Sequence, residues 1–318
     1  MRYFFYLFIA LLVGSCAKKN EVEEAIDTMD LSIEWNRFDK DFVETLENDF
    51  NTLRTKYSFL LPANVEDSVW FNKRNDSLFQ VVTQEVQSKY PDLSLVEEPV
   101  NSVLKHIHYY FPDEYPKRVV TLVSDVDVNS RAIYADSLLL LSLDTYLGKD
   151  HRFYKVFPEY TLRDFETNRL PIDVAYSFAM QKVPMTNDRT LLGQMIYFGK
   201  ILALVDHLVP DASQELKLNY TKEELQWAKE NEVEIWKFFV DKKYLYDTNP
   251  KLFQRFIQKA PFSKFYLAFD NESPGSIGVF IGNEIVQSYL KNNNVTLHEL
   301  LIKDEKEIFD NAKYKPKK

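Results

Sequence analysis

The sequence is poor in the residues from which reactive or covalently cross-linked sites are built. It contains one cysteine, seven glycines and five histidines in 318 residues. A single cysteine excludes an internal disulfide, so stability must come from a packed core. The patterns of a serine nucleophile elbow, a phosphate loop and a dinucleotide-binding loop are missing. The chain therefore carries none of these three standard catalytic or binding motifs.

Basic clusters are also scarce, and the formal net charge is −9. Such an acidic chain is a poor match for nucleic acid or an anionic membrane surface. The exception is a short basic tail, Lys313–Lys318, which we expect to be solvated. What the chain does contain is 45% hydrophobic and 15% aromatic residues, which suffices for a sizeable core.

The N-terminus has the features of an export signal. An apolar run of 11 residues, Tyr3–Val13, follows Arg2; this is about half the length needed to span a bilayer. The run ends in Val13-Gly14-Ser15-Cys16, which looks like a bacterial lipobox. We predict a signal peptide over 1–15 and acylation of Cys16. The alternative is a free thiol buried in an apolar N-terminal strand.

The segment after Cys16 is polar and mostly acidic. Residues 16–30 are therefore predicted to be a lipidated N-terminus and a tether. Ala17, rather than aspartate, follows the cysteine, which favours the outer membrane by the sorting rule of enteric bacteria. No repeat or linker follows, so we predict one globular domain over 31–313 and a basic tail over 314–318.

Apolar periodicity predicts a mainly helical α+β fold with a small central sheet. Before the sheet, Asp39 is a candidate N-cap for one helix over Asp39–Tyr57, in which Phe42, Leu46, Phe50 and Leu53 share a face. Two further helices are expected over 76–90 and 100–111. The predicted strands are Arg118–Ser124, Arg131–Ala135 and Leu138–Leu143, and the last, apolar on both faces, should be interior.

The remainder of the chain is predicted to be helical. Helices are expected over Pro171–Val183, Asp188–Val209 and Lys251–Lys259, with Pro250 in the first turn of the last. Capping boxes at Thr221 and Thr296 open two more, and Ser273-Pro274 begins a glycine-containing helix.

Histidine and carboxylate spacing gives little support to a metal site. His106 and His108 are two apart in a helical pattern, where such positions diverge. His298-Glu299 lacks a second histidine four residues after the first. His151 and His207 stand beside aspartates and are interpreted as solvated pairs or helix-end charges. Candidate buried carboxylates are Asp144, Asp173 and Asp206.

Three of the seven glycines fall within eight positions of the stretch Ser273–Tyr289. Gly278 and Gly282 are four apart, so they share a helix face and allow another backbone to approach closely. The partner is either an internal helix, for which the one carrying Gly193 and Gly199 is the natural candidate, or an external protein. The predicted packing or interaction motif comprises Pro274, Gly275, Gly278, Gly282 and Tyr289.

Several motifs resemble the gliding motility-associated lipoprotein family GldB, known from the Bacteroidota. They are the lipobox, Arg37-Phe38-Asp39, Asp144-x-Tyr146-Leu147-Gly148, Leu191-Leu192-x-x-Met195-Ile196-Tyr197-x-Gly199-Lys200, and the glycine stretch Ser273–Tyr289. The resemblance covers essentially the whole mature chain. It departs from the family at Ser276, where arginine is expected, and at Phe280 and Asn283, where tryptophan-like aromatics are expected.

The family is in turn more distantly similar to a family of proposed zinc proteases with an H-E-x-x-H helix. Motif order aligns Pro171–Met180 with that helix and Phe198-Gly199 with a later glutamate-glycine pair. Neither segment keeps a zinc ligand. The resemblance therefore implies a zincin-like scaffold that has lost its metal.

Two hypotheses follow. The first is a lipid-anchored, non-catalytic envelope protein without cofactor, which faces the periplasm, contacts other gliding or secretion proteins and binds no nucleic acid. The second is a metal-dependent hydrolase with unusual ligands drawn from His106, His108, Asp144 or Asp173.

Overall fold

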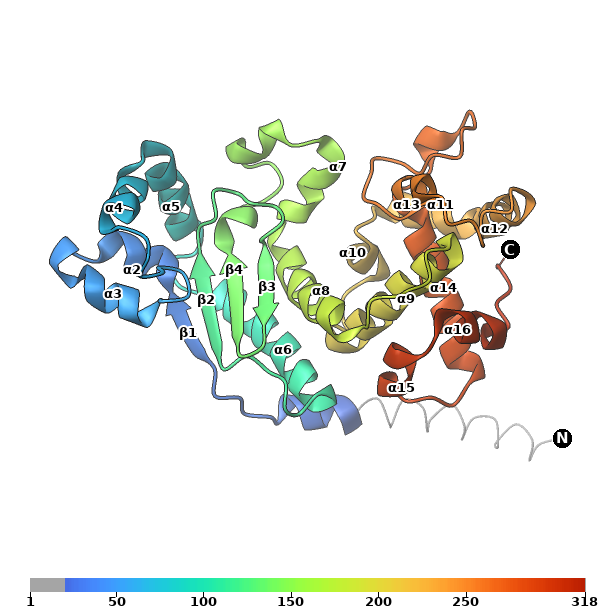
Figure 1. Cartoon of the computed structure of the whole chain (residues 1–318), viewed down its shortest axis with the longest axis horizontal. Coiled ribbons are helices and arrows are strands. Elements are labelled where there is room, and N and C mark those ends of the chain that lie inside the picture. Colours follow the sequence, from blue (N-terminus) through green and yellow to red (C-terminus); the bar gives the residue numbers. More distant parts are fainter. Residues whose placement is uncertain (1–20, 318) are drawn as a thin grey trace, which may run out of the picture.

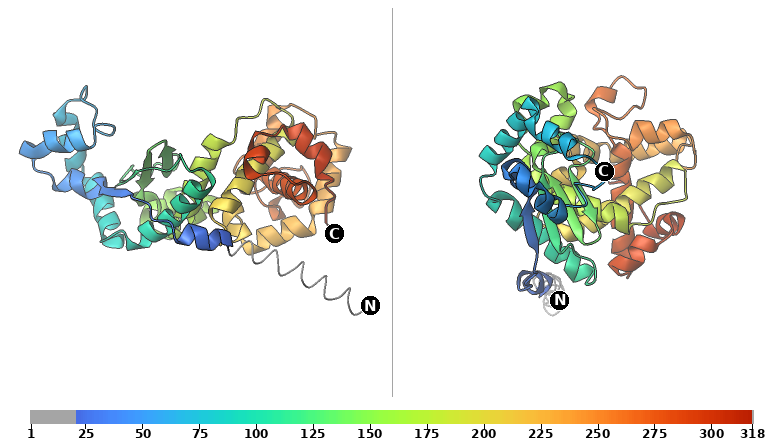
Figure 2. Two further views of the ribbon diagram at one scale, coloured as in Figure 1. Left: turned by 90° about the horizontal axis from the view of Figure 1, so that it is seen from below. Right: turned by 60° about the vertical axis from the view of Figure 1, so that its left-hand side comes forward.

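The computed structural model describes residues 21–317 of the chain. The predicted signal peptide (1–15) and Cys16 lie outside the described residues. The described part is a predominantly helical α+β fold with one small sheet, as predicted (Figure 1). Its shape is elongated, with the early helices at one end and the C-terminal helices at the other (Figure 2).

The principal elements follow one another along the chain. They are β1 Glu34–Arg37, α2 Phe38–Glu44, α3 Phe50–Lys56, α4 Asp67–Asn75, α5 Ser77–Lys89, α6 Ser94–Tyr110, β2 Arg118–Leu122, β3 Ala132–Ala135, β4 Leu138–Ser142, α7 Glu159–Leu162, α8 Leu170–Lys182, α9 Leu191–Leu208, α10 Gln214–Leu218, α11 Lys222–Glu230, α12 Glu232–Asp241, α13 Pro250–Phe256, α14 Ile277–Asn292, α15 Leu297–Ile302 and α16 Glu305–Ala312.

The sheet has the strand order β1-β2-β4-β3. β1, β2 and β4 run parallel, and β3 pairs antiparallel with β4. The three predicted strands are confirmed to within two residues at each end. β1 was not predicted, because its sequence Glu34-Trp35-Asn36-Arg37 lacks the apolar character of a central strand.

Both faces of the sheet are covered by helices, which explains why the central strands are apolar on both sides. Val119, Leu139 and Leu141 belong to a core shared with α6, α8 and α9. Val120, on the opposite face, packs in a cluster with α2, α3 and α5. Since β4 lies between β2 and β3, the prediction of an interior strand is confirmed.

The single helix predicted over Asp39–Tyr57 is wrong. The segment forms α2 and α3, separated by an irregular stretch and a short 3-10 turn. Leu46, assigned to the apolar face, is 70% exposed. Asp39 does not cap the helix; it lies buried in the first turn of α2, where it pairs with Arg37 and accepts a hydrogen bond from Thr121 Oγ1. A tertiary contact therefore overrides the local helical pattern.

The next two predicted helices are confirmed as α5 and α6. Asp76 caps α5 by accepting a hydrogen bond from Phe79 N at 2.9 Å. Leu78, at the apolar spacing of Val82 and Val86, would be expected on the buried face of α5, but it is 63% exposed and Phe79 is buried instead. α6 begins earlier than expected, at Ser94. α4 was not predicted, because none of its residues is buried and it carries no apolar stripe.

The helices predicted after the sheet are confirmed as α8, α9, α11, α13 and α15, with small shifts at their ends. Both capping boxes form, at Thr221 and Thr296, and Pro250 occupies the first turn of α13. α14 begins at Ile277, three residues after Pro274, rather than at Ser273-Pro274 as predicted.

α9 runs through the centre of the molecule and is apolar over most of its surface. Tyr197 and Ile201 join the core against the sheet, whereas Met195 and Ile196 join a second core formed with the C-terminal helices. Among the described residues it is the one helix with the length and apolar composition of a membrane span, yet 78% of it is buried within the protein. We interpret it as a core helix.

α14 packs along α9 through glycines, which agrees with the predicted internal partner. A Cβ atom on Gly282 would overlap the carbonyl oxygen of Met195, and one on Gly199 would overlap that of Gly282. Gly278 adjoins Ile257, just after α13, as well as the Met195 side chain of α9. Gly193, also expected at this contact, lies against the side chain of Asp188 and does not face α14.

Two terminal segments are more closely docked than predicted. Residues 21–27, within the predicted tether, are helical and held against the domain: Ile26 is buried, and Lys105 Nζ donates to Asp27 O at 3.0 Å. In the basic tail, Tyr314 packs edge-on against Trp236 and donates to Glu232 Oε1 at 2.8 Å. The prediction of a solvated tail is therefore wrong for Tyr314.

Candidate functional site

A cavity of about 710 Å³, here called the α8 cleft, lies between the start of β3, α8, α9 and the start of α14. The segment between α7 and α8, α10, the start of α11 and α13 also contribute to its wall. Clefts of this size are typical of sites for small molecules and short peptide segments. The elements that surround it come from widely separated parts of the chain (Figure 1).

One face of α8 lines the cleft. The contributing side chains are Asp173, Tyr176, Ser177 and Met180, whose spacing of three, four and seven residues places them on a common helix face. Phe198 of α9 lies on the same cavity wall. The cleft thus joins the two segments, Pro171–Met180 and Phe198-Gly199, that motif order had aligned with the zinc-protease site. The zincin-like scaffold itself stays a prediction.

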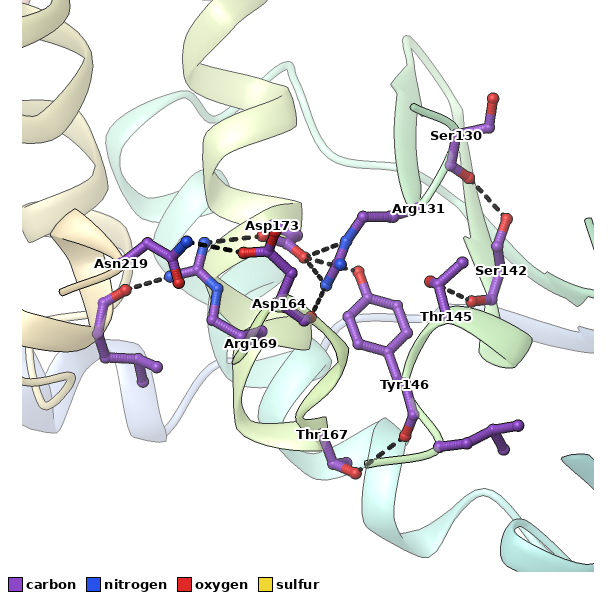
Figure 3. A network of polar contacts seen from close by, with 12 residues as sticks. Ser130, Arg131, Ser142, Thr145, Tyr146, Asp164, Thr167, Arg169, Asp173 and Asn219 are labelled. Carbon is purple, nitrogen blue, oxygen red and sulfur yellow. Dashed lines mark hydrogen bonds and ion pairs between the residues drawn. The ribbon is translucent and has the colours of Figure 1, made fainter. Parts of the chain in front are cut away.

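Asp173 is the centre of a polar network at the cleft wall (Figure 3). Its Oδ2 accepts hydrogen bonds from Arg131 Nε at 2.9 Å and from the Tyr146 hydroxyl at 3.0 Å. Its Oδ1 accepts one from Arg169 Nη2 at 3.1 Å. Both oxygens of the carboxylate are therefore engaged by cationic or neutral donors.

Tyr146 reaches this network from the short turn that follows β4. It is completely buried. Burial, together with the negative charge of Asp173, raises the pKa of Tyr146 well above its ordinary value. The hydroxyl accordingly remains protonated and acts as a donor to Asp173.

A second carboxylate, Asp164, extends the network along the cleft wall. Asn219 Nδ2 donates to Asp164 Oδ1 at 2.8 Å, and Lys259 Nζ pairs with Oδ2. The backbone oxygen of Asp164 accepts from Arg131. Burial lowers the pKa of Lys259 below its ordinary value; the negative charge of Asp164 opposes this shift, and the charge of Arg169 adds to it.

The start of the glycine motif forms part of the same wall. Gly275 and Ser276 line the cleft, and Gly275 O accepts a hydrogen bond from the Tyr220 hydroxyl at 2.9 Å. Ser263 Oγ donates to Pro274 O at 2.8 Å. Ser276 has a left-handed backbone with φ of 55°, which explains why α14 begins only at Ile277.

The remaining motif positions lie deeper in the fold. Tyr289 is buried in the C-terminal core. Asn283, where the chain departs from the family pattern, is buried, and its Oδ1 has no hydrogen-bond partner among residues 21–317. The motif therefore combines helix packing with one edge of the cleft.

The edge strand β3 is closed off by α8. Tyr134 N donates to Ser177 Oγ at 2.9 Å, and Gln181 Nε2 donates to Tyr134 O. The backbone groups of Tyr134 that point away from β4 are thus satisfied by side chains of the helix. A peptide cannot pair with this part of the strand without displacing them.

The four ligands considered for a hydrolase are not brought together. His106 Nε2 lies 3.3 Å from Glu23, and His108 packs edge-on against Tyr115. Asp144 accepts hydrogen bonds from the backbone N–H groups of Ser124 and Val126, which partly offset the rise in its pKa caused by burial. Within residues 21–317, no three His, Cys, Asp or Glu side chains form a group able to hold a metal ion.

The arginines of the cleft were missed by sequence reasoning. Arg131 precedes β3 and Arg169 precedes α8, and neither belongs to a recognisable motif. Tyr146 does lie in the Asp144-x-Tyr146-Leu147-Gly148 motif, which was the available signal. Asp173 was identified as a candidate buried carboxylate, and the structure places it near-buried, with 17% of its side chain exposed.

Comparison with protein families and known proteins places the chain in a family. The family model described as gliding motility protein GldB matches residues 19–316. No curated protein and no solved structure gave a match.

Proposed function

Because the chain belongs to the GldB family of gliding motility proteins, we propose that it is a lipid-anchored, non-catalytic envelope protein that supports gliding or the associated secretion machinery through protein contacts. The observation that carries the proposal is the family match over residues 19–316. Involvement in gliding motility and a lipoprotein nature follow from the family; the anchor, the membrane and the absence of catalysis are the proposed parts.

The anchor is proposed to be acyl chains on Cys16, which hold the domain on the periplasmic face of the outer membrane. The lipobox pattern that ends at Cys16 supports this arrangement. Replacing Cys16 with alanine should move the protein from the membrane pellet to the soluble fraction. A Cys16→Ala protein that still sediments with membranes would overturn the anchor.

The motility role is tested in cells. A strain that lacks the protein should fail to spread, and the wild-type gene should restore spreading. The Cys16→Ala gene should restore it poorly at equal protein level, because the domain would no longer be held near its partners. Full restoration by this variant would show that the anchor is dispensable.

The absence of catalysis is supported by the state of Asp173. Its two carboxylate oxygens are occupied by Arg131, Arg169 and Tyr146, so the group is poorly placed to act as a base or a metal ligand. We propose that the cleft is the remnant of a zincin-like site. Metal analysis of the purified protein tests this: stoichiometric zinc would favour the hydrolase hypothesis instead.

A further inference from the structure

We propose that the α8 cleft binds a ligand that presents one carboxylate group on an apolar body, with Arg131 and Arg169 as the anchoring cations. This inference goes beyond the proposed function, since it depends neither on the membrane anchor nor on motility.

The first argument is charge balance. Five cationic side chains and three carboxylates line the cleft: Arg131, Arg163, Arg169, Lys217 and Lys259, against Asp164, Asp173 and Glu224. Three of the cations have a carboxylate each, in the pairs Arg163–Glu224, Lys259–Asp164 and Lys217–Asp206. Arg131 and Arg169 share Asp173. One positive charge is therefore in surplus here, in a chain whose net charge is −9.

The second argument is burial. The side chains of Arg131 and Arg169 are only 11% and 9% exposed, and a buried charge is costly unless it is paired. Within residues 21–317, Arg131 Nη1 and Arg169 Nε have no hydrogen-bond partner. The Tyr146 ring, 4.7 Å from the Arg131 guanidinium carbon, offsets part of this cost but carries no charge. An anion at this wall would balance the surplus.

The third argument is the end of α14. Gly275, Ser276 and Val279 line the cleft, so the N-terminus of this 16-residue helix faces it. The first turn contains no acidic residue and the Ser276 side chain does not cap it; the Ile277 N–H donates instead to the uncharged Ser263 Oγ at 3.1 Å. The partial positive charge of a helix N-terminus therefore adds to that of the two arginines.

The rest of the wall defines the body of the ligand. Tyr176, Met180, Phe198, Phe253 and Val279 supply an apolar surface next to the arginines. The single surplus positive charge matches the one negative charge of a carboxylate better than a phosphate group, which carries up to two negative charges. Both a small carboxylic acid and the C-terminus of a peptide that ends in apolar residues fit this description.

The experiment is calorimetric titration of the full mature protein in detergent micelles at neutral pH. One pair of probes is 4-phenylbutyrate and its amide; the other is the tripeptide alanyl-leucyl-phenylalanine with a free or an amidated C-terminus. Each acid should bind at least about tenfold more tightly than its amide, because only the acid makes charge-assisted hydrogen bonds. The acid that binds more tightly identifies the source, a small molecule or a protein C-terminus.

Arg169→Gln should remove the preference for the acid, whereas Arg152→Gln, at an exposed arginine outside the cleft, should keep it. If Arg169→Gln does not fold, Met180→Glu serves instead: Met180 is 42% exposed, and a carboxylate there should weaken acid binding by about tenfold.

The proposal is overturned if acids and amides bind equally, if neither acid binds at up to about 10 mM, or if the folded cleft variants bind the acids as the wild type does. None of these results would affect the Cys16 or motility tests.

Discussion

The α9–α14 contact and the α8 cleft are adjacent and share helices, yet they are built on opposite principles. Where α14 crosses α9, glycines let the two helices approach until backbone meets backbone, and the nearest neighbours of these glycines are uncharged. At the cleft, two nearly buried arginines share one carboxylate. The glycine contact is made within the chain alone, whereas the cleft carries a surplus positive charge. A stability core and a recognition surface are thus distinguished here by whether their charges are balanced.

The largest effect is expected from Asp173→Ala, which removes the shared carboxylate and leaves two nearly buried guanidinium groups without a counter-charge. The cost in free energy of unfolding should be about 3 kcal/mol, the lower end of the range for breaking a buried ion pair, because the groups are slightly exposed. Urea unfolding measures it.

The control for Asp173→Ala is Asp310→Ala, which breaks an exposed pair with Lys306 on α16. That change should cost no more than about 0.5 kcal/mol. Equal losses in the two variants would contradict the difference drawn between a buried network and a solvated one.

Gly282→Leu should destabilise the α9–α14 contact by up to about 3 kcal/mol, because the obstacle is the Met195 backbone and not a flexible side chain. Thermal unfolding of the variant measures the loss. Lys291→Leu, at an exposed position of the same helix, is the matched control and should be nearly neutral. An unchanged melting temperature for Gly282→Leu would mean that the two helices are not in close contact.

The smallest effect is a change of stability with pH that involves Lys259. It should stay below about 1 kcal/mol, because the Lys259 side chain is half-exposed. The folded-state pKa of Lys259 lies below its ordinary 10.5, so protonated Lys259 weakens the folded state at neutral pH. Stability should therefore rise as pH increases from that lowered pKa toward 10.5. In Lys259→Gln this contribution is missing. The free energy of unfolding of the wild type should therefore increase relative to that of Lys259→Gln as the pH rises. A difference between the two proteins that stays constant or shrinks with rising pH would refute the prediction.

The two regions also differ in how far sequence predicts them. The capping boxes at Thr221 and Thr296 and the packing of Gly282 follow from short-range patterns, because the spacing of residues along a helix fixes which of them share a face. The lipobox is a local pattern of the same kind. Such features are accessible without a structure.

The cleft could not be derived in this way. Arg131 and Asp173 are 42 residues apart, and Tyr146 comes from a third element. Which arginine meets which carboxylate depends on the order of strands and on the path of α8, which no local pattern encodes. The same reason explains the error at Asp39: its carboxylate is held by Thr121, on a strand more than eighty residues away.

The contact between α8 and β3 has a consequence for solubility. An open strand edge can recruit the edge of a neighbouring molecule and seed aggregation. Ser177 and Gln181 occupy both outward backbone groups of Tyr134, in the middle of the four-residue β3. The protein can therefore be crowded among its own copies without that edge acting as a template.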